Sequence, residues 1–287
     1  MKIVVLDSNY LCYRALHTTG GLSYKNIKTG VIYGFLNQLL TIAGQTRPDS
    51  VVFAWDSRQS KRREICPSYK NRKHRSDPVE AEEMRDVFKQ FRTLRKEVIP
   101  NIGFDDIFKF RGLEADDIIA QMVMDERYKD HEFTVVTGDD DLLQLLDYCR
   151  IYHPMKLEWK DRDWFIKSYG IVPQKWTMVK QMAGCTSDNV KGISGVGEKK
   201  AIQYLTGKMS PNSKIYSRIE SKESQFIINR NKELVCLPFK GTPKVDLSES
   251  EVRVHMRRLR RICKELGIRT LISPDKHDEW EAYLNGE

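Results

Sequence analysis

Short apolar stretches that end at an acidic residue alternate with helical patterns in the first 160 residues, and this alternation constrains the fold most. Residues 2–6 are apolar and β-branched and run directly into Asp7, and residues 50–55 run into Asp56. Strands that alternate with helices predict an α/β fold with a doubly wound, mainly parallel sheet. The predicted strands are residues 2–6, 50–55, 105–110, 131–137 and 148–153. The predicted helices are residues 9–16, 31–44, 77–100, 114–127 and 142–146.

Acidic residues follow several of these predicted strands. Because the carboxyl ends of parallel strands meet at one edge of a sheet, Asp7, Asp56 and the acids at 139–141 should converge there with Glu114–Asp117. Three carboxylates within Glu114–Asp117 repel one another when partly buried, and a divalent metal is the best counter-charge. The alternative is that these acids only favour the first turn of a helix through its dipole.

The composition is consistent with separate roles for the basic and the acidic residues. The 287 residues include 48 Lys and Arg against 40 Asp and Glu, a net charge of +8. The bases would attract a polyanion while the acids hold cations, although a merely soluble basic protein has the same balance. Six scattered cysteines without a CxxC pair argue against a disulfide framework and fit a reducing cytoplasm. No apolar run approaches the roughly 20 residues of a membrane span.

Two further segments carry patterns typical of phosphate binding. Residues 58–75 contain eight Lys or Arg and one acid, and Tyr69 among them could stack on a base, although a solvated loop has the same composition. Residues 192–200 form a glycine-rich turn before a Lys-bearing helix, which offers backbone amides to a phosphate. This turn matches neither a dinucleotide motif nor a P-loop. Six bases in residues 253–264 most simply form a solvated helix face, with DNA contact as the alternative.

The order and spacing of the motifs resemble the flap endonuclease family of 5′-nucleases, found free-standing and as the N-terminal part of bacterial repair DNA polymerases. The resemblance covers roughly residues 1–235. It rests on the segments Leu6-Asp7, Tyr13-Arg14-Ala15, Thr29-Gly30, Tyr33-Gly34-Phe35, Trp55-Asp56, Tyr69-Lys70-Asn71-Arg72, Glu114-Ala115-Asp116-Asp117, Thr137-Gly138-Asp139-Asp140-Asp141-Leu142 and Ser187-Asp188-Asn189 to Ala201.

The resemblance implies a phosphodiesterase that uses two divalent metal ions, Mg²⁺ or Mn²⁺. It implies that the first metal is held or oriented by Asp7, Asp56, Glu114, Asp116 and Asp139. It implies that Asp117, Asp141 and Asp188 serve the second metal or its waters.

The resemblance also assigns DNA contacts. Lys70 matches the phosphate-steering lysine, with Arg62 and Arg72 as basic companions, in a helical arch through which a 5′ single strand passes. The loop at 182–206 resembles a helix–hairpin–helix that grips duplex phosphates and often a K⁺ ion. The residues expected to contact DNA are Tyr13, Arg14, Tyr69, Gly192, Gly195, Gly197, Lys199 and Lys200.

The sequence departs from the family pattern at two places. The Tyr-Lys-x-Asn-Arg pattern lacks its spacer in Tyr69–Arg72, and the Gly-Asp-x-x-Asp-Asn pattern has Cys185 where a second-metal carboxylate is expected. A thiol is mostly neutral at pH 7 and is a soft ligand. We therefore expect a second site that is weakly occupied or tuned to Mn²⁺, and expect Cys185→Asp to lower the Mg²⁺ requirement.

These observations predict a nuclease core in residues 1–160, with an arch at about 58–100, and a helical region in residues 161–287. The predicted protein is a cytoplasmic monomer, from a bacterium or a phage-infected cell, that acts on DNA with a free 5′ end or 5′ flap, and by extension on RNA primers and RNA/DNA hybrids. Two alternatives stay open: a branched-DNA-binding protein whose catalysis Cys185 impairs, and a phosphatase-type enzyme with Asp7 as nucleophile. The second predicts an acid two residues after Asp7, where Asn9 stands.

Overall fold

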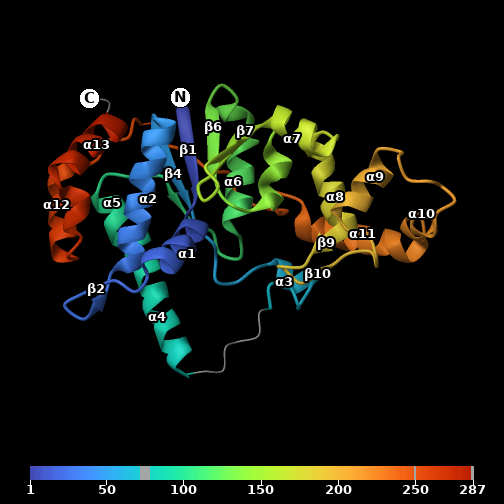
Figure 1. The fold of residues 1–287 in the computed structure, drawn as a ribbon, viewed down its shortest axis with the longest axis horizontal. Helices are drawn as coiled ribbons and strands as arrows, with labels where there is room; N and C mark the ends of the chain where they lie inside the picture. The colour runs from blue at the N-terminus through green and yellow to red at the C-terminus, as the bar shows by residue number, and fades with distance from the viewer. Residues whose placement is uncertain (72–77, 249, 286–287) are drawn as a thin grey trace.

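The computed structural model describes residues 1–71, 78–248 and 250–285, built around one six-stranded sheet (Figure 1). Neighbouring strands follow the order β5-β4-β1-β6-β7-β8, and every pair is parallel except β7 with β8. The strands are β1 (Lys2–Asp7), β4 (Ser50–Ala54), β5 (Ile107–Phe108), β6 (Glu132–Val136), β7 (Cys149–His153) and β8 (Glu158–Lys160). The predicted doubly wound, mainly parallel sheet is confirmed.

Strand β1 lies at the centre of the sheet because nearly all of its side chains are apolar. It pairs with β4 on one side and β6 on the other, so that Leu6 lies opposite both Phe53 and Val136. A strand buried on both faces reads as a continuous apolar run, as residues 3–6 do. This central position puts Asp7 in the middle of the edge formed by the strands' carboxyl ends.

Helices cover both faces of the sheet. Helices α1, α2 and α4 share one apolar core with the C-terminal helices α12 and α13, and α6, α7 and α8 share the other with the 3₁₀ helix η3. The first group is α1 (Ser8–Thr19), α2 (Gly30–Thr46), α4 (Pro78–Thr93), α12 (Met256–Glu265) and α13 (Pro274–Leu284). The second is α6 (Ala115–Val123), η3 (Asp140–Leu145), α7 (Arg162–Tyr169) and α8 (Trp176–Ala183).

The helices that follow α8 lie at two opposite ends of the molecule (Figure 1). Helices α9 (Glu198–Leu205), α10 (Lys214–Ile219) and α11 (Lys222–Val235) lie at one end, and α12 and α13 lie at the other, against α2 (Figure 1). Trp176 of α8 and Ala201 of α9 pack in the same core as Ile118 of α6. The predicted boundary at residue 160 therefore crosses a continuous core, and the two-domain division stays a prediction.

Several elements differ from the sequence expectation. The helix expected at 114–127 ends at Val123, and the 3₁₀ turn η2 (Glu126–Tyr128) follows. The helix expected at 77–100 is α4, a π-helical turn η1 (Leu94–Val98) and α5 (Ile99–Asn101). The expected helix at 142–146 is the 3₁₀ helix η3. The sequence did not predict β8, α13, β2 (Ser23–Tyr24), β3 (Ile27–Lys28), α3 (Arg62–Ile65), β9 (Gly184–Cys185), β10 (Val190–Lys191) and η5 (Arg269–Ile272).

Candidate metal centre and nucleic-acid interface

Four aspartates meet at the carboxyl edge of the sheet and form what we call the first cluster: Asp7, Asp56, Asp116 and Asp139. Asp7 ends β1, Asp56 follows β4, Asp116 lies in the first turn of α6, and Asp139 follows β6. The charge of Asp7 acts on Asp116, and those of Asp56 and Asp139 act on both Asp7 and Asp116. Predicted strand ends from distant parts of the chain thus converge on one site.

Burial and mutual repulsion disfavour the charged state of the first cluster. Burial, followed by the charge of Asp56, raises the pKa of Asp7 to about 7. Burial and the charge of Asp141 raise the pKa of Asp139 to about 6, and burial together with Asp139 raises that of Asp116 well above its usual range. A site that holds this much unneutralised carboxylate favours a bound cation.

Backbone and side-chain donors orient these carboxylates. Asp7 caps α1 by accepting from the Tyr10 amide at 3.0 Å, and its other oxygen accepts from the Thr137 hydroxyl at 3.1 Å. Asp56 accepts from the Ala115 amide at 2.8 Å, which ties β4 to the start of α6. Because each carboxylate keeps lone pairs that these donors do not use, the cluster can still bind a ligand.

Glu114 and Lys70 lie beside the first cluster. The Lys70 ammonium is 2.9 Å from a carboxylate oxygen of Glu114 and 3.8 Å from one of Asp188. Burial would raise the pKa of Glu114, but Lys70 and Arg62 together hold it below its usual range. The Lys70 backbone, in the left-handed region with φ 47°, donates to the Asp188 carbonyl at 2.9 Å. The predicted phosphate-steering lysine is thus held between the two groups of acids.

A second cluster consists of Asp141, Cys185 and Asp188. One ligand atom of each residue lies within 4.8 Å of the others. The Cys185 sulfur is 3.0 Å from the Ser187 hydroxyl, and burial raises the pKa of its thiol to about 11. Lys180, which is buried, joins Asp141 at 2.9 Å to Glu198, the first residue of α9, also at 2.9 Å. Lys180 was not predicted as a site residue, because its position in an amphipathic helix carries no separate signal.

Asp117 lies outside the second cluster, contrary to the role implied by the resemblance. Both of its oxygens accept from the guanidinium of Arg62 at 2.7 Å, and they also accept from the amides of Glu114 and Phe239. Glu114 and Asp117 form a capping box at the start of α6. The dipole alternative therefore describes Glu114 and Asp117, whereas Asp116 in the same run faces the first cluster.

Arg62 and Tyr69 are also buried rather than open to a phosphate or a base. Arg62 is 2 % exposed and is occupied by Asp117 and the Leu234 carbonyl, so its predicted catalytic role does not fit this position. Tyr69 is 3 % exposed, and its hydroxyl donates to Glu114 at 3.0 Å, so it has no open face for stacking. Arg72, the third predicted arch residue, lies outside the described residues.

The glycine-rich loop follows the short antiparallel hairpin of β9 and β10. A Cβ on Gly184 would collide with the backbone of Val190 and Gly192, and a Cβ on Gly192 would collide with the backbone at the end of α8. Lys200 donates to the Gly195 carbonyl at 2.8 Å, and Gly197 caps α9 while Lys199 is exposed. The buried amide of Asn231 on α11 donates to the carbonyls of Gln181 and Lys191 and fixes the hairpin.

Tyr13 and Arg14 lie on α1 near the arch helix α4. The ring of Tyr13 packs edge-on against Phe91 of α4 at 5.3 Å between centroids. Arg14 donates to Gln38 at 2.7 Å and contacts the Pro154 carbonyl. Both residues are half-buried, so Tyr13 packs beneath α4 while Arg14 is held by α2 and the Pro154 carbonyl.

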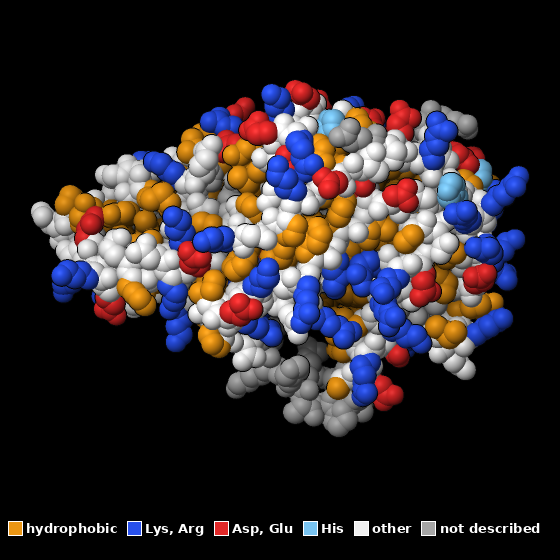
Figure 2. All heavy atoms as spheres, turned by 180° about the vertical axis from the view of Figure 1, so that it is seen from behind, with side chains coloured by type: hydrophobic (Ala, Val, Ile, Leu, Met, Phe, Trp, Pro, Cys, Tyr) orange, Lys and Arg blue, Asp and Glu red, His pale blue; other side chains and the backbone are white. Residues whose placement is uncertain are grey.

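A further basic group lies beside Asp56. Lys109 donates to the Asp56 carbonyl, and the charges of Arg95 and Arg58 lower its pKa after the larger effect of burial. Burial and Arg92 likewise lower the pKa of Arg95. Figure 2 shows Lys and Arg side chains gathered where α4 meets the sheet. Of these four residues, Arg58 belongs to the predicted basic segment 58–75, whereas Arg92, Arg95 and Lys109 were not predicted to join it because their charge density is ordinary.

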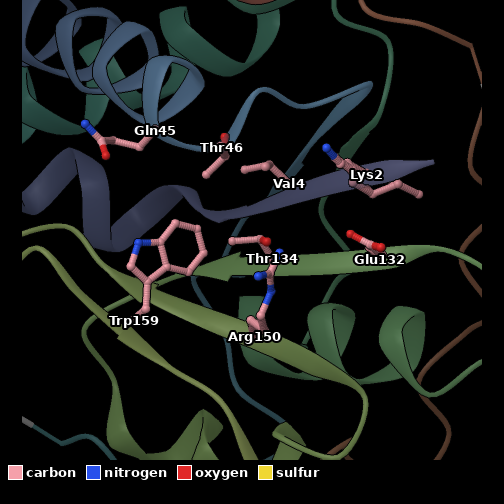
Figure 3. Close-up of a pocket in the computed structure, with 9 residues that line it drawn as sticks. Lys2, Val4, Gln45, Thr46, Glu132, Thr134, Arg150 and Trp159 are labelled. Atoms are coloured by element: carbon pink, nitrogen blue, oxygen red, sulfur yellow. The ribbon is translucent and has the colours of Figure 1, made fainter.

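A cavity of about 160 Å³ lies at the opposite edge of the sheet (Figure 3). Lys2 and Glu132, at the starts of β1 and β6, line it together with Arg150 and Trp159. Five residue steps along β1, roughly 16 Å, separate Lys2 from Asp7. This cavity is therefore no part of the carboxylate site.

A sequence model of the family described as "5′-3′ exonuclease, N-terminal resolvase-like domain" matches residues 2–170. The chain belongs to the 5′-3′ exonuclease family. A 5′-3′ exonuclease of Aquifex aeolicus is 28% identical over 94% of this chain and 93% of its own length. A 5′-3′ exonuclease of Mycoplasmopsis pulmonis is 30% identical over 77% of this chain and 71% of its own length. The predicted family and 5′-nuclease class are confirmed.

This exonuclease chain spans only part of some relatives. DNA polymerase I of Caldicellulosiruptor bescii is 30% identical over 82% of this chain but only 29% of the polymerase. The T5 D15 protein, co-crystallised with metal ions, superposes with a TM-score of 0.69 at 18% identity, covering 83% of this chain and 90% of that protein. This likeness supports the fold of the exonuclease chain. Among its described residues, no helix is both long and apolar enough to cross a bilayer.

Proposed function

We propose that this chain hydrolyses phosphodiester bonds in DNA that has a free 5′ end, cutting 5′ flaps and removing nucleotides in the 5′→3′ direction. The observation that carries this proposal is the convergence of four aspartates, whose charges act on one another, at the carboxyl edge of the sheet. Family membership supports the reaction class, and the T5 protein of similar fold was crystallised with metal ions.

The first cluster fits a hard divalent cation, Mg²⁺ or Mn²⁺. Its donors are all carboxylate oxygens, and their mutual repulsion favours a cation among them. The ion would be held by Asp7, Asp56, Asp116 and Asp139. Glu114, which lies beside them, would help to orient the ion. Asp141, Cys185 and Asp188 would hold a second ion. Bound divalent ions would supply an activated water and stabilise charge on the attacked phosphate.

The side chain of Lys70 would position the scissile phosphate. Its ammonium lies between Glu114 and Asp188, and its charge also acts on Asp116, so it can reach a phosphate placed over both clusters. In this proposal, Asp117 and Arg62 contact neither the metal ions nor the DNA. Their bidentate pair instead fixes the start of α6 and the end of α11.

The helix–hairpin–helix loop would hold duplex phosphates. Residues 192–197 present backbone amides ahead of α9, with Lys199 exposed beside them, and this loop would also hold a K⁺ ion. The Lys180 bridge to Glu198 connects this loop to Asp141. The 5′ single strand would pass the basic group of Arg58, Arg95 and Lys109. RNA primers, RNA/DNA hybrids and a monomeric, cytoplasmic protein belong to this proposal as extensions.

A branched-DNA-binding protein with impaired catalysis is the second candidate, and Cys185 is the observation that favours it. One test separates the two functions: cleavage of a 5′-labelled flap substrate in Mg²⁺ or in Mn²⁺. We expect cleavage near the flap junction that Asp116→Asn abolishes and that Asp130→Asn, a change at an exposed acid outside both clusters, preserves. Tight flap binding without cleavage in either metal would favour the binding protein.

A further inference from the structure

We infer that the second cluster selects a thiophilic divalent cation, such as Zn²⁺, Co²⁺ or Cd²⁺, over Mg²⁺. The inference rests on the proposed function for the existence of a second metal site, and it goes beyond that function by naming the class of metal. It is carried by the chain's own donor set at Asp141, Cys185 and Asp188.

The three donor atoms are close enough to share one ion. In a tetrahedral zinc site, a sulfur at about 2.3 Å and an oxygen at about 2.1 Å from the ion are roughly 3.6 Å apart. The sulfur of Cys185 and one oxygen each of Asp141 and Asp188 all lie within 4.8 Å of one another. Side-chain rotations that bring these atoms closer by up to about 1 Å would place all three on one tetrahedral ion.

The position of Cys185 is fixed by the backbone pairing of the β9–β10 hairpin. Cys185 pairs with Val190 across the β9–β10 hairpin, and Gly184 before it adopts φ 76° in close contact with Gly192. The turn between the two strands carries Asp188, whose amide donates to the Cys185 carbonyl. The same hairpin therefore presents the sulfur and one carboxylate to the site.

The charge of the second cluster disfavours a hard cation. Lys180 is 2.9 Å from Asp141, and Lys70 is 3.8 Å from Asp188, so each carboxylate already has an ammonium partner. Mg²⁺ depends on oxygen ligands, and sulfur is a poor substitute. A thiolate bond is the strongest interaction that this donor set can offer, and it favours Zn²⁺, Co²⁺ or Cd²⁺.

The number of protein ligands also fits such an ion. Three protein donors with an open position are the arrangement of catalytic zinc sites, whereas structural sites are closed by four. The thiol proton would pass to solvent as the metal binds. The open position would remain for a water or a phosphate oxygen.

The test is a Co²⁺ titration of the metal-stripped protein, followed by its absorption spectrum, because a cobalt–thiolate bond gives a charge-transfer band in the near ultraviolet. We expect the band in the unmodified chain and its loss in Cys185→Ser. Cys66→Ser is the matched control, because Cys66 is also half-buried and bonded to a serine hydroxyl but lies outside the second cluster. Thermal melts of each variant establish that it folds.

Calorimetry with Cd²⁺ and Mg²⁺ gives the second readout. Losing an outer-shell partner of a metal typically costs about 10- to 100-fold in affinity, so loss of the sulfur in Cys185→Ser should weaken Cd²⁺ at least that much. Cys185→Asp should strengthen Mg²⁺ at this site. A band that persists in folded Cys185→Ser, or Cd²⁺ affinity unchanged by it, would overturn the inference. Flap cleavage is measured in a separate assay. If the proposed function fails there, the metal-binding result for the second cluster can still be interpreted.

Discussion

At Asp7, burial and neighbouring negative charges disfavour the ionised state that metal binding requires. Asp7 is 8 % exposed, and it faces the charges of Asp56 and Asp139, yet a metal-binding role requires it to be ionised. Its pKa of about 7 lies well above the ordinary value of 3.8. In the metal-free protein, therefore, the folded state holds a proton that the unfolded state releases, and pH decides how much this contributes to stability.

We predict that the metal-free protein loses stability as the pH rises from about 4 to about 7. The raised pKa contributes stability below the unfolded value of 3.8, and this contribution is lost as the pH passes the folded value of about 7. Asp7→Asn removes the ionisation, and Asn keeps the helix cap. Melts in chelator at pH 8 should therefore show a higher Tm for Asp7→Asn than for the unmodified chain, and added Mg²⁺ should reverse that order. A lower Tm for Asp7→Asn in chelator would contradict this account.

Arg62 and Asp117 form a buried ion pair that stabilises the protein only as a pair. Their side chains are 2% and 0% exposed, and two bonds of 2.7 Å join them. We predict that Arg62→Met lowers the free energy of unfolding by about 3–5 kcal/mol, because it leaves a buried carboxylate without its counter-charge. The double variant Arg62→Met with Asp117→Leu should recover much of that loss. Urea unfolding of the two variants tests this, and equal losses would show that Asp117 is stabilised by other donors.

At the scale of elements, helix ends position the site. Asp7 caps α1, Glu114 and Asp117 cap α6, and Gln90 of α4 accepts from the Val31 and Ile32 amides at the start of α2. Thr29, the N-cap residue of α2, makes no side-chain bond to the backbone of that helix. The arch helix α4 is therefore joined to the sheet-covering helix α2 by a buried hydrogen bond.

The exposed Lys199 in the first turn of α9 should contribute to duplex affinity without a role in cleavage. We predict that Lys199→Ala weakens duplex binding about equally for all sequences and reduces the salt dependence of the binding constant by about one unit of slope, as loss of one phosphate contact does. Fluorescence anisotropy at several salt concentrations measures both. Lys264→Ala on α12, at the other end of the molecule, is the control; an equal effect there would mean that binding is delocalised over the basic surface.

Much of the site was predictable because its signal is local. Asp7, Asp56 and Asp139 each follow an apolar strand, and parallel strands bring their ends together whatever the intervening sequence. Arg62 and Tyr69 were misread because composition indicates charge but not direction. Arg62 turns inward only because Asp117, 55 residues away, offers it a bidentate partner. An ion pair between residues so far apart in the sequence produces no periodic pattern from which it could be predicted.

At the scale of the whole molecule, the C-terminal helices complete the core of the nuclease sheet although they lie at the far end from the glycine-rich loop (Figure 1). Leu259 and Cys263 of α12 and Trp280 and Leu284 of α13 are buried with residues of α2. Arg47, which ends α2, donates to the Ala282 carbonyl at 2.8 Å. The basic residues of α12 face outward, while its apolar side closes a core that begins at β1.

We therefore predict that Trp280→Ala lowers the free energy of unfolding by about 3–5 kcal/mol, as removal of a large buried aromatic side chain does. The Trp280 side chain is fully buried, and its indole donates to the Leu271 carbonyl at 3.2 Å. Trp159→Ala, at a tryptophan that is 39% exposed, is the matched control and should cost much less. While it remains folded, Trp280→Ala should cleave flaps at the rate of the unmodified chain, since α13 contributes no residue to either carboxylate cluster. A loss of cleavage rate at full folding would show instead that α13 acts on the site, which would make the C-terminal helices part of the catalytic unit rather than its support.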